Sequence, residues 1–354
     1  MWVGRRALMV RPCHVATGLL VVMLGASASG AGDVHLEPPE GWQFRASPDV
    51  DVVGDEIVVQ ISNIDHEADA LLYRRGVRQR IIDLPHRSDG LELSPDGGML
   101  LVRRPAGEGD CHGGGGSLLG SDGTLLWEIQ EDLYLSFGAD GTSIVGWPRA
   151  GACRSGTRVT ILGLNGKPRL EHDAGEPVYG VTAIRGGSRL VLSTAEALVG
   201  LERSADDPAT LIEAWRRPHR FSTSALRVVG HDRFITEGRF GRFDIIDGDG
   251  GEIFAYDPIS LGGGDADNPW ALRTPAQGLA GDELLLFDGS SLAHRIGSAG
   301  DRPTPVDIDA RLPGDFERRP RLIRGHLVFD RTDRVVVRRL APPRASRIEG
   351  EKLE

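Results

Sequence analysis

A short pattern that recurs seven times along the chain is the feature that most restricts the fold. Each copy is a turn rich in Gly or Asp followed by three or four apolar residues, as in Asp96-Gly-Gly-Met-Leu-Leu-Val. The first residues of the apolar triplets in the seven copies are Ile57, Leu100, Ile144, Leu190, Phe234, Leu284 and Leu327. These residues lie 43, 44, 46, 44, 50 and 43 positions apart. Such a fixed period indicates a repeat architecture in which each copy folds as one unit.

A second turn lies between successive copies. It reads Ser121-Asp-Gly-Thr-Leu-Leu-Trp in one repeat and Asn165-Gly-Lys-Pro-Arg-Leu in the next. Asp-Gly and Asn-Gly between apolar runs predict hairpins, because both central residues of the tight turn need positive φ. Each repeat then holds four strands, and four-stranded units of about 40–50 residues are typical of β-propeller blades. The sequence therefore predicts an all-β, seven-bladed β-propeller of antiparallel blades over residues 42–343. A β-sandwich or two stacked barrels is the alternative, which leaves the even spacing unexplained.

The two ends of the repeat region are expected to meet. The last copy lacks a fourth strand, because its strands at Leu327–Asp330 and Arg334–Leu340 run into Pro342-Pro343. An orphan strand, Trp42-Gln-Phe-Arg, precedes the first copy. We expect this N-terminal strand to complete the last blade and close the ring, with residues 29–41 as a leader and residues 344–354 as a polar tail. Residues 195–203 have weakly helical character, which makes the fourth blade the least regular.

Several of these motifs resemble known propeller repeats. Leu119-Gly-Ser-Asp-Gly-Thr-Leu-Leu-Trp-Glu is similar to the PQQ-like repeat, in which an Asp/Gly turn leads into a strand that ends in Trp, and Ile246-Asp-Gly-Asp-Gly-Gly-Glu-Ile-Phe is a weaker copy. Leu93-Ser-Pro-Asp-Gly-Gly-Met-Leu-Leu resembles the WD40-like repeat of bacterial periplasmic propellers. The resemblance implies blades of an exported bacterial propeller and no particular activity. Quinone-dependent members carry adjacent cysteines over the cofactor, which this chain lacks, so no bound quinone is expected.

The N-terminus has the form of an export signal. The charged residues before Asp33 are Arg5, Arg6 and Arg11. An apolar run from Val15 to Leu24 follows, and Ala26-Ser-Ala has the spacing of a signal peptidase site. We therefore predict a signal peptide over residues 1–28 and a mature protein in the periplasm or outside the cell. The run is shorter than the roughly 20 residues of a spanning helix, so no membrane span is expected. A membrane anchor is the alternative.

The charge balance restricts the class of partner. With 41 basic and 51 acidic residues the chain has a net charge of −10, which argues against nucleic acid. The segment 311–347 departs from this balance, with eleven arginines against four acidic residues. It fits either an anionic docking surface or charged strands that discourage edge-to-edge aggregation. We expect a monomer with a protein or glycan partner.

Removal of the signal peptide takes away Cys13 and leaves Cys111 and Cys153. An exported chain with one pair of cysteines favours a disulfide. Both cysteines follow the second strand of neighbouring blades, so their loops are expected on the same face. The enclosed loop of about 42 residues corresponds to a stabilisation of roughly 4 kcal/mol. Two free thiols, or a metal site that includes His112, are the alternatives.

The loops that join one blade to the next share this loop-rich face and border the central channel. They carry polar candidate ligand residues: His86, Asp89, Asp132, His172, Glu176, His219, Asp265 and Asp267. Three imidazoles in corresponding loops, His86, His172 and His219, are candidate ligands of a transition metal. Surface loops are rich in polar residues in any case, so solvated loops without a cofactor are the simpler interpretation.

No catalytic set is recognisable in the sequence. Asp247-Gly-Asp-Gly-Gly-Glu has oxygen ligands spaced like part of a calcium loop, but it lacks the later ligands and reads better as a hairpin turn. There is no Gly-x-Ser-x-Gly elbow of a serine hydrolase. Two functions remain. The first is a non-catalytic scaffold that binds a protein or glycan through the loop-rich face. The alternative is a metal-assisted lyase or hydrolase acting on a sugar or lactone.

Overall fold

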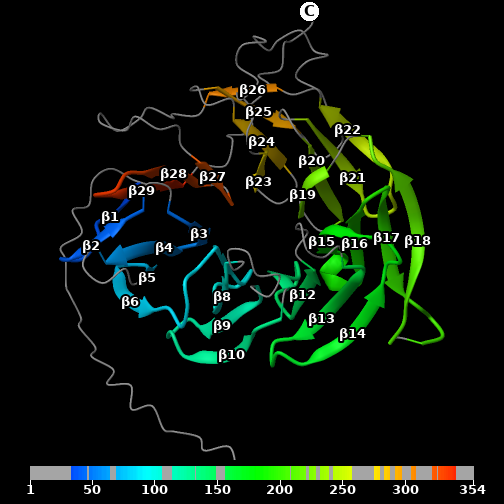
Figure 1. Ribbon diagram of the computed structural model, residues 1–354. Helices are drawn as coiled ribbons and strands as arrows, with labels where there is room; N and C mark the ends of the chain where they lie inside the picture. The colour runs from blue at the N-terminus through cyan, green and yellow to red at the C-terminus, as the bar shows by residue number, and fades with distance from the viewer. Residues whose placement is uncertain are drawn as a thin grey trace, which may run out of the picture.

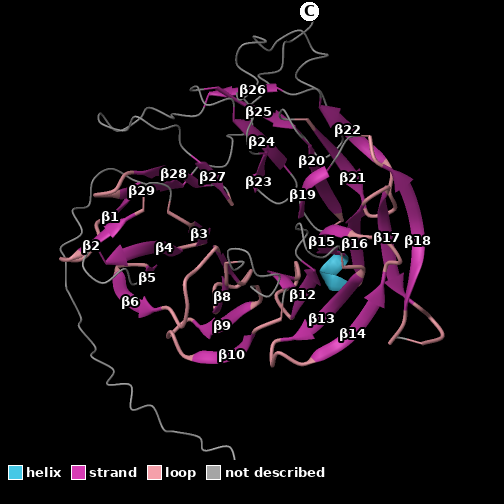
Figure 2. Ribbon diagram, in the orientation of Figure 1, coloured by secondary structure: helices cyan, strands magenta, loops and turns pink. Residues whose placement is uncertain are grey.

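The computed structural model describes a chain of β-strands arranged around a common centre (Figure 1). The described residues are 33–45, 48–63, 69–105, 114–131, 133–148, 156–207, 209–220, 223–228, 232–238, 242–256, 275–279, 283–287, 292–296, 304–307, 321–324 and 326–339. In these residues the strands form seven antiparallel sheets, and a single 3₁₀ turn, η1 (Arg185–Gly187), interrupts them (Figure 2). No helix in this part of the chain has the length and apolar character needed to cross a membrane.

The sheets follow one another in sequence order, and we number them accordingly. Sheet 1 contains β2 (Trp42–Phe44), β3 (Val50–Val53), β4 (Glu56–Asn63), β5 (Asp69–Arg75) and β6 (Arg78–Asp83). Sheet 2 contains β7 (Gly90–Leu93), β8 (Met99–Arg103), β9 (Gly116–Gly120) and β10 (Leu125–Ile129). Sheet 3 contains β11 (Leu133–Phe137), β12 (Ser143–Pro148), β13 (Arg158–Gly163) and β14 (Pro168–Asp173).

The remaining sheets continue the same order. Sheet 4 contains β15 (Val178–Ile184), β16 (Arg189–Thr194), β17 (Ala197–Arg203) and β18 (Leu211–Pro218). Sheet 5 contains β19 (Thr223–Val228), β20 (Arg233–Gly238), β21 (Phe243–Asp247) and β22 (Glu252–Tyr256). Sheet 6 contains β23 (Pro275–Leu279), β24 (Glu283–Phe287), β25 (Leu292–Ile296) and β26 (Thr304–Asp307). Sheet 7 contains β1 (Asp33–Leu36), β27 (Arg321–Ile323), β28 (His326–Asp330) and β29 (Val335–Arg339).

The repeated apolar triplets form the second strand of each sheet. Outside sheet 6 these strands are largely buried, and in β16 every residue is buried. Such continuous apolar runs are expected where a strand is covered on both sides. The hydrophobic core accordingly lies between sheets: Val145 and Ile161 of sheet 3 share a cluster with Leu192 and Val199 of sheet 4. The fourth strands lie at the rim, and β14 and β18 are mostly exposed, with one buried residue each (Figure 1).

The two ends of the sheets differ. In sheets 2, 3 and 4 tight turns join the first to the second strand, and successive turns touch each other, because Gly141 lies against Pro95 and Gly187 lies against Asp140. These turns therefore share one end of the molecule, which we call the turn end. The described connections from β14 to β15 and from β16 to β17 lie at the opposite end, which we call the loop end.

The N-terminal strand that joins the last sheet is not the predicted one. Asp33–Leu36 pairs antiparallel with β29, and it lies inside the segment 29–41 interpreted above as a leader. The prediction for Trp42-Gln-Phe-Arg was wrong, since Trp42–Phe44 pairs with β4 of sheet 1. The reason is strand length: β4 has eight residues and β3 has four, so half of the β4 edge is left for a second short strand.

The first and last sheets also share a hydrophobic cluster. Val328 and Val337 of sheet 7 pack with Ile57 and Val59 of sheet 1. The backbone amide of Phe44 also donates to the carbonyl of Thr332, between β28 and β29. The residues at the two ends of the described chain are thus packed against each other.

Two tryptophans on rim strands fix sheet 2 to sheet 3 and sheet 4 to sheet 5. Trp127 Nε1 donates to the Leu164 carbonyl, and Trp215 Nε1 donates to the Gly248 carbonyl, each at 2.8 Å. Both acceptors begin the turn between the third and fourth strands of the following sheet. The glycine two residues later, Gly166 or Gly250, has positive φ and lies directly against the indole ring. The Trp predicted from the repeat motif is therefore a connector between sheets.

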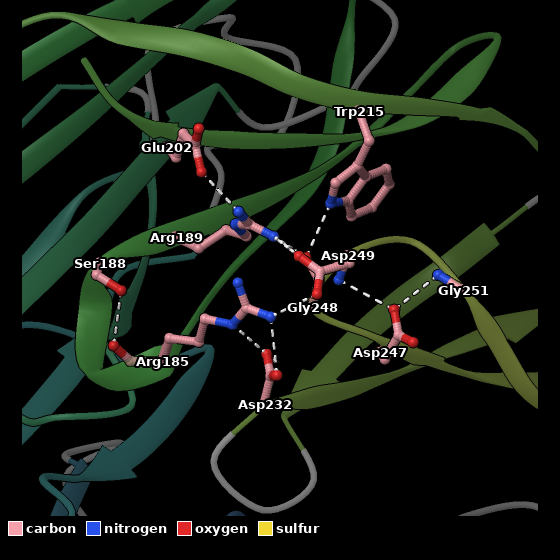
Figure 3. Close-up of polar contacts among 10 residues, drawn as sticks. All are labelled: Arg185, Ser188, Arg189, Glu202, Trp215, Asp232, Asp247, Gly248, Asp249 and Gly251. Carbon is pink, nitrogen blue, oxygen red and sulfur yellow. Dashed lines mark hydrogen bonds and ion pairs between the residues drawn. The ribbon is translucent and has the colours of Figure 1, made fainter. Parts of the chain in front are cut away.

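Figure 3 shows the junction of sheets 4 and 5 at the turn end. Arg185 bonds both Asp232, at 2.5 and 2.9 Å, and Asp249, at 2.9 Å. Arg189, which is buried, pairs with Asp249 and Glu202, each at 2.6 Å. The guanidinium groups thus fix one edge of sheet 4 to the turns of sheet 5.

The calcium-like sequence lies in the same junction and forms a hairpin turn. The side chain of Asp247 accepts the amides of Asp249 and Gly251 at 3.0 and 2.7 Å (Figure 3). Its oxygen is therefore occupied by its own turn, which confirms the hairpin interpretation.

The weakly helical character of residues 195–203 was misleading. Ala197–Arg203 forms β17, a central strand of sheet 4 paired on both edges. Its apolar side chains alternate between two clusters, with Val199 and Leu201 facing sheet 3 and Leu198 facing sheet 5. Tertiary packing decides the conformation here, and local propensity is only a weak guide where it conflicts with burial.

Candidate functional site

Glu176, one of the candidate ligand residues, lies at the loop end of sheet 4. It lies in the connection from β14 to β15, and its carboxylate accepts Arg216 Nη1 at 2.6 Å and the Glu196 amide at 3.3 Å. Burial favours the neutral acid, but the hydrogen bonds from Arg216 and Thr194 outweigh it and lower the pKa of Glu176. The carboxylate is therefore ionised at neutral pH and already committed to protein donors.

His219 lies beside Glu176 on the same end. Its Nε2 lies 2.9 Å from the Thr194 carbonyl, and its backbone amide donates to the Glu196 carbonyl at 3.4 Å. Because a carbonyl only accepts, Nε2 carries the proton and has no lone pair for a metal. The imidazole is thus oriented by the loop between β16 and β17.

His172 lies within a strand, where a loop position is predicted. It is in β14, opposite Val159. Its partial burial lowers the pKa of the imidazole, although Asp173 and Glu213 act in the opposite direction. His172 is therefore a largely neutral, half-buried strand residue.

His86 and Asp89 belong to sheet 2, away from the other candidates. His86 contacts the Arg87 carbonyl through Nδ1 at 2.7 Å and the Ser117 hydroxyl through Nε2 at 2.9 Å. The Asp89 amide donates to the Arg103 carbonyl at 2.9 Å. Each predicted imidazole thus has its own environment, and the described residues contain no group of three or more His, Cys, Asp or Glu side chains placed to hold a metal ion. The structure does not bring the three histidines together.

Five predicted residues lie outside the described part of the chain. They are the cysteines of the predicted disulfide and three acidic loop residues: Cys111, Cys153, Asp132, Asp265 and Asp267. The predicted signal peptide over residues 1–28 and the polar tail over residues 344–354 also lie outside it. All of these stay predictions.

The innermost strands carry carboxylates that reach from one sheet to the next. Asp51 on β3 accepts the amide of Leu93 at 2.7 Å, and Glu92 on β7 accepts the amide of Phe137 at 3.2 Å. Leu93 and Phe137 occupy corresponding positions, so the contact repeats between successive sheets. An innermost strand has one unpaired edge, and the carboxylates satisfy amides on that edge. Burial raises the pKa of Asp51 and of Glu92.

A cross-strand ion pair recurs at the same position in three sheets. In two of them the acidic and basic residues have exchanged strands. Glu92 pairs with Arg103 at 3.0 Å, with the acid on the innermost strand. Arg227–Glu237 in sheet 5, at 2.9 Å, and Arg321–Asp330 in sheet 7, at 3.4 Å, place the base on the innermost strand. The repeat therefore places a charged residue at this position of the innermost strand, but that residue can be acidic or basic.

Arg103 reaches the centre because Gly90 has no side chain. A Cβ at Gly90 would lie 2.6 Å from Arg103 Nη2. The guanidinium lies 4.9 Å from the centroid of the Tyr134 ring, which in turn packs on Trp147 at 4.8 Å. Burial opposes its charge, but Tyr134, Glu92, Asp49 and Asp51 outweigh burial and raise the pKa of Arg103. The charge of Arg103 is therefore balanced by the acidic side chains around it, Glu92, Asp49 and Asp51.

The arginine-rich C-terminal segment is also engaged internally where it is described. Arg324 pairs with Asp51 at 3.2 Å and donates to the Leu93 carbonyl at 3.1 Å, which connects sheet 7 to sheets 1 and 2. Arg321 donates to the Pro48 carbonyl at 2.8 Å. These arginines therefore contribute to packing between the first and last sheets.

The sequence did not predict a role for Tyr179, the most exposed aromatic residue in the described part of the chain. Tyr179 lies on β15, an innermost strand, and its side chain is 47% exposed. The pairing of β15 with β16 shifts register between Val178 and Gly180, so Tyr179 is the extra residue of a β-bulge. Bulges re-aim side chains and are frequent near functional sites. Nothing in the local sequence marks the bulge except Gly180, which has no side chain to oppose Ser193.

Comparisons with known proteins concern the structure. No protein-family model matches the sequence, and no curated protein matches it. The structure resembles a chain of the mitotic checkpoint complex, with 14% identity, coverage of 91% of this chain and 100% of that chain, and a TM-score of 0.52. It also resembles the computationally designed Ika8 protein, with 10% identity, coverage of 84% and 97%, and a TM-score of 0.50.

A further similarity is to BamB from Moraxella catarrhalis, with 15% identity, coverage of 83% of this chain and 82% of that chain, and a TM-score of 0.47. At such identities a likeness concerns the fold alone. These likenesses concern the fold, and in the part of the chain that the structure describes the protein is all-β, with antiparallel sheets of four strands and a fifth strand in sheet 1.

Proposed function

We propose that this protein is an exported, non-catalytic, seven-bladed β-propeller that binds a protein or glycan through its loop end. In this proposal the ring is closed through the pairing of β1 with β29, and the protein acts as a monomer without a cofactor. Seven sheets in sequence order and the hydrophobic cluster shared by sheets 1 and 7 support the closed ring. The charged N-terminus and apolar run of residues 1–28 support export.

The proposed lack of catalysis is supported by the state of the charged groups. Catalytic acids and bases need a proton-transfer atom within reach of a substrate. Glu92 and Asp51 are bonded to backbone amides and arginines, and Glu176 is bonded to Arg216. The Nε2 atoms of His86 and His219 are likewise bonded, to Ser117 and Thr194. We therefore do not favour the lyase or hydrolase.

The observation that carries the binding proposal is the position of Tyr179. Six large apolar side chains are exposed in the described residues, and five of them belong to fourth strands or their turns: Val77, Ile81, Leu125, Leu126 and Ile212. Tyr179 differs, because it lies on an innermost strand next to the loop end. Tyrosine is enriched among residues that dominate binding energy, since it offers a large contact area with few rotatable bonds.

Site-specific photo-crosslinking tests the proposal. A photoreactive amino acid replaces one exposed residue at a time: Tyr179 and Glu131 at the loop end, or Asn165 and Asp207 at the turn end. The protein is expressed with its N-terminus in a cell that exports it, and adducts are resolved by mass spectrometry. We expect adducts of one partner from the loop-end positions and none from the turn-end positions. Adducts from the turn end alone would contradict the proposal, and a carbohydrate adduct would identify the glycan form of it.

A further inference from the structure

The loop end of sheet 4 carries a small exposed surface with its own chemistry. We name it the Tyr179 surface and define it by the exposed residues Tyr179 and Glu196. Resting on the proposed function, we propose that the Tyr179 surface docks a cationic segment of a partner protein, with an arginine side chain stacked on the Tyr179 ring and paired with Glu196.

The first step is the bulge. Val178 pairs with Thr194 and Gly180 pairs with Ser193, so Tyr179 has no partner across the ladder. An extra residue in an innermost strand disturbs the ladder locally and turns its side chain outward. Tyr179 is consequently 47% exposed between two buried neighbours, Val178 and Gly180. Packing within the sheet does not require an exposed aromatic ring at this position.

The second step is an unsatisfied polar group beside the bulge. The Ser193 hydroxyl is buried, with the residue 2% exposed, and it has no hydrogen-bond partner in the described structure. Ser193 lies across from Gly180, and its Cβ is 3.9 Å from the place a Gly180 Cβ would take. A buried hydroxyl without a partner destabilises the fold by about 1–3 kcal/mol. Local features that oppose stability concentrate at functional sites. The unpartnered hydroxyl of Ser193 and the bulge at Tyr179 are two such features; they are adjacent, and neither depends on charge.

The third step is the charge around the ring. Glu196 is exposed at the turn after β16, and its backbone is tied to both Glu176 and His219. Asp173 is exposed at the end of β14, and hydrogen bonds from Thr157 and the Gly175 amide lower its pKa. Both side chains are exposed, and the hydrogen bonds to Asp173 keep its carboxylate charged at neutral pH.

The nearby cation does not cancel this charge. Arg216 pairs with Glu176 at 2.6 Å and with Glu213 at 3.0 Å, so two carboxylates already face one guanidinium. The His219 Nε2 proton is donated to a carbonyl. The surface therefore places the exposed Glu196 side chain at the same end of sheet 4 as the exposed Tyr179 ring.

Arginine is the side chain that this combination fits best. A guanidinium stacks on an aromatic ring by cation–π attraction and still offers donors at its edge to a carboxylate. The same protein already uses this geometry at its centre, where Arg103 lies over Tyr134 and pairs with Glu92. A neutral sugar gains nothing from the surrounding carboxylates as charges, so the observations favour a protein partner.

Peptide titration followed by NMR on the mature protein tests the inference. The probe is a blocked, flexible peptide with two arginines separated by glycine, and its control is the same peptide with citrulline, which keeps the shape and removes the charge. A neutral glucan oligosaccharide is titrated in parallel. We expect the arginine peptide to bind about three to ten times more tightly than the citrulline peptide. Equal binding of the two peptides, or binding of the oligosaccharide alone, would overturn the inference.

Variants assign the binding to the Tyr179 surface. Tyr179→Ala and Glu196→Gln are each expected to weaken the arginine peptide about three- to tenfold, while Tyr179→Phe keeps its affinity. Leu126→Ala is the matched control, because Leu126 is 50% exposed on a rim strand of sheet 2 and should leave affinity unchanged. Affinity that is the same in Tyr179→Ala as in Leu126→Ala overturns the inference.

The crosslinking experiment separates this inference from the proposed function. A partner captured at both Tyr179 and Glu131, and crosslinked through a segment that contains arginine or lysine at the Tyr179 position, supports both. Capture at Glu131 without capture at Tyr179 overturns the inference and leaves the loop-end scaffold standing. No capture at either position contradicts both.

Discussion

Asp33 and Arg338, 305 residues apart in the sequence, are joined by two hydrogen bonds of 2.8 and 2.9 Å across the neighbouring strands β1 and β29. The bidentate geometry orients the guanidinium, which also lies 5.5 Å from the ring centroid of Phe329. This pair connects the first described strand of the chain to the last one. The ion pair therefore stabilises the pairing of β1 with β29.

Replacing Asp33 by Asn tests this connection through its pH dependence. The hydrogen bond from Arg338 lowers the pKa of Asp33 below that of the unfolded chain. The stabilisation is therefore present above about pH 4 and is lost as the pH falls through the folded pKa. We expect Asp33→Asn to reduce the free energy of unfolding by about 1 kcal/mol at neutral pH. Urea denaturation should show the difference between the two proteins shrinking toward pH 3, and a difference independent of pH would contradict this assignment.

Glu92 is expected to show the opposite pH dependence. Burial raises the pKa of Glu92 above that of the unfolded chain. Its contribution to stability is therefore fully present below about pH 4 and is lost as the pH rises through the folded pKa. Glu92→Gln imitates the protonated acid, so the stability of this variant relative to the wild type should increase with pH. Denaturation curves at several pH values measure the slope, and a decrease with pH would refute the expectation.

The connection between sheets through tryptophan predicts an asymmetry between two glycines. Gly250 has φ of +84° and a Cβ there would lie 2.8 Å from the Trp215 ring, whereas Gly175 has φ of +72° and open space around it. Gly175→Ala should therefore show the backbone effect alone, about 1 kcal/mol. Gly250→Ala should be more destabilising, because the turn must also move away from the indole. Thermal unfolding compares the two, and equal losses would show that the Trp215 contact is unimportant.

Cys111 and Cys153 are predicted to form a disulfide in the exported protein. Alkylation of the mature protein should label neither cysteine before reduction and both after it. Mass spectrometry of a non-reduced digest should then contain the crosslinked pair of peptides. Full labelling without reduction would establish free thiols instead.

The repeat determined most of what could be predicted. The triplets that begin at Ile57, Leu100 and Ile144 form second strands because continuous burial requires the same apolar run in every sheet. The tryptophan in Leu119-Gly-Ser-Asp-Gly-Thr-Leu-Leu-Trp indicates a blade, and its connecting role follows from the glycine turn of the next sheet.

Features that depend on pairing between distant segments could not be predicted in the same way. Both Asp33–Leu36 and Trp42–Phe44 are short and partly apolar, and only the free edge of β4 and the position of Arg338 decide which strand joins which sheet. The bulge at Tyr179 depends on register with β16, which no local residue specifies. The histidines resembled one another in sequence position, but their partners are in different sheets.

Hydrogen–deuterium exchange tests whether the loop end is the binding surface. The mature protein is compared alone and with the partner that the crosslinking identifies. We expect slower exchange at the amides of 174–180 and 194–198, with the turns at 164–167 and 248–251 unchanged. Protection confined to the turn end, or to the rim strand β10 with its exposed Leu125 and Leu126, would contradict it.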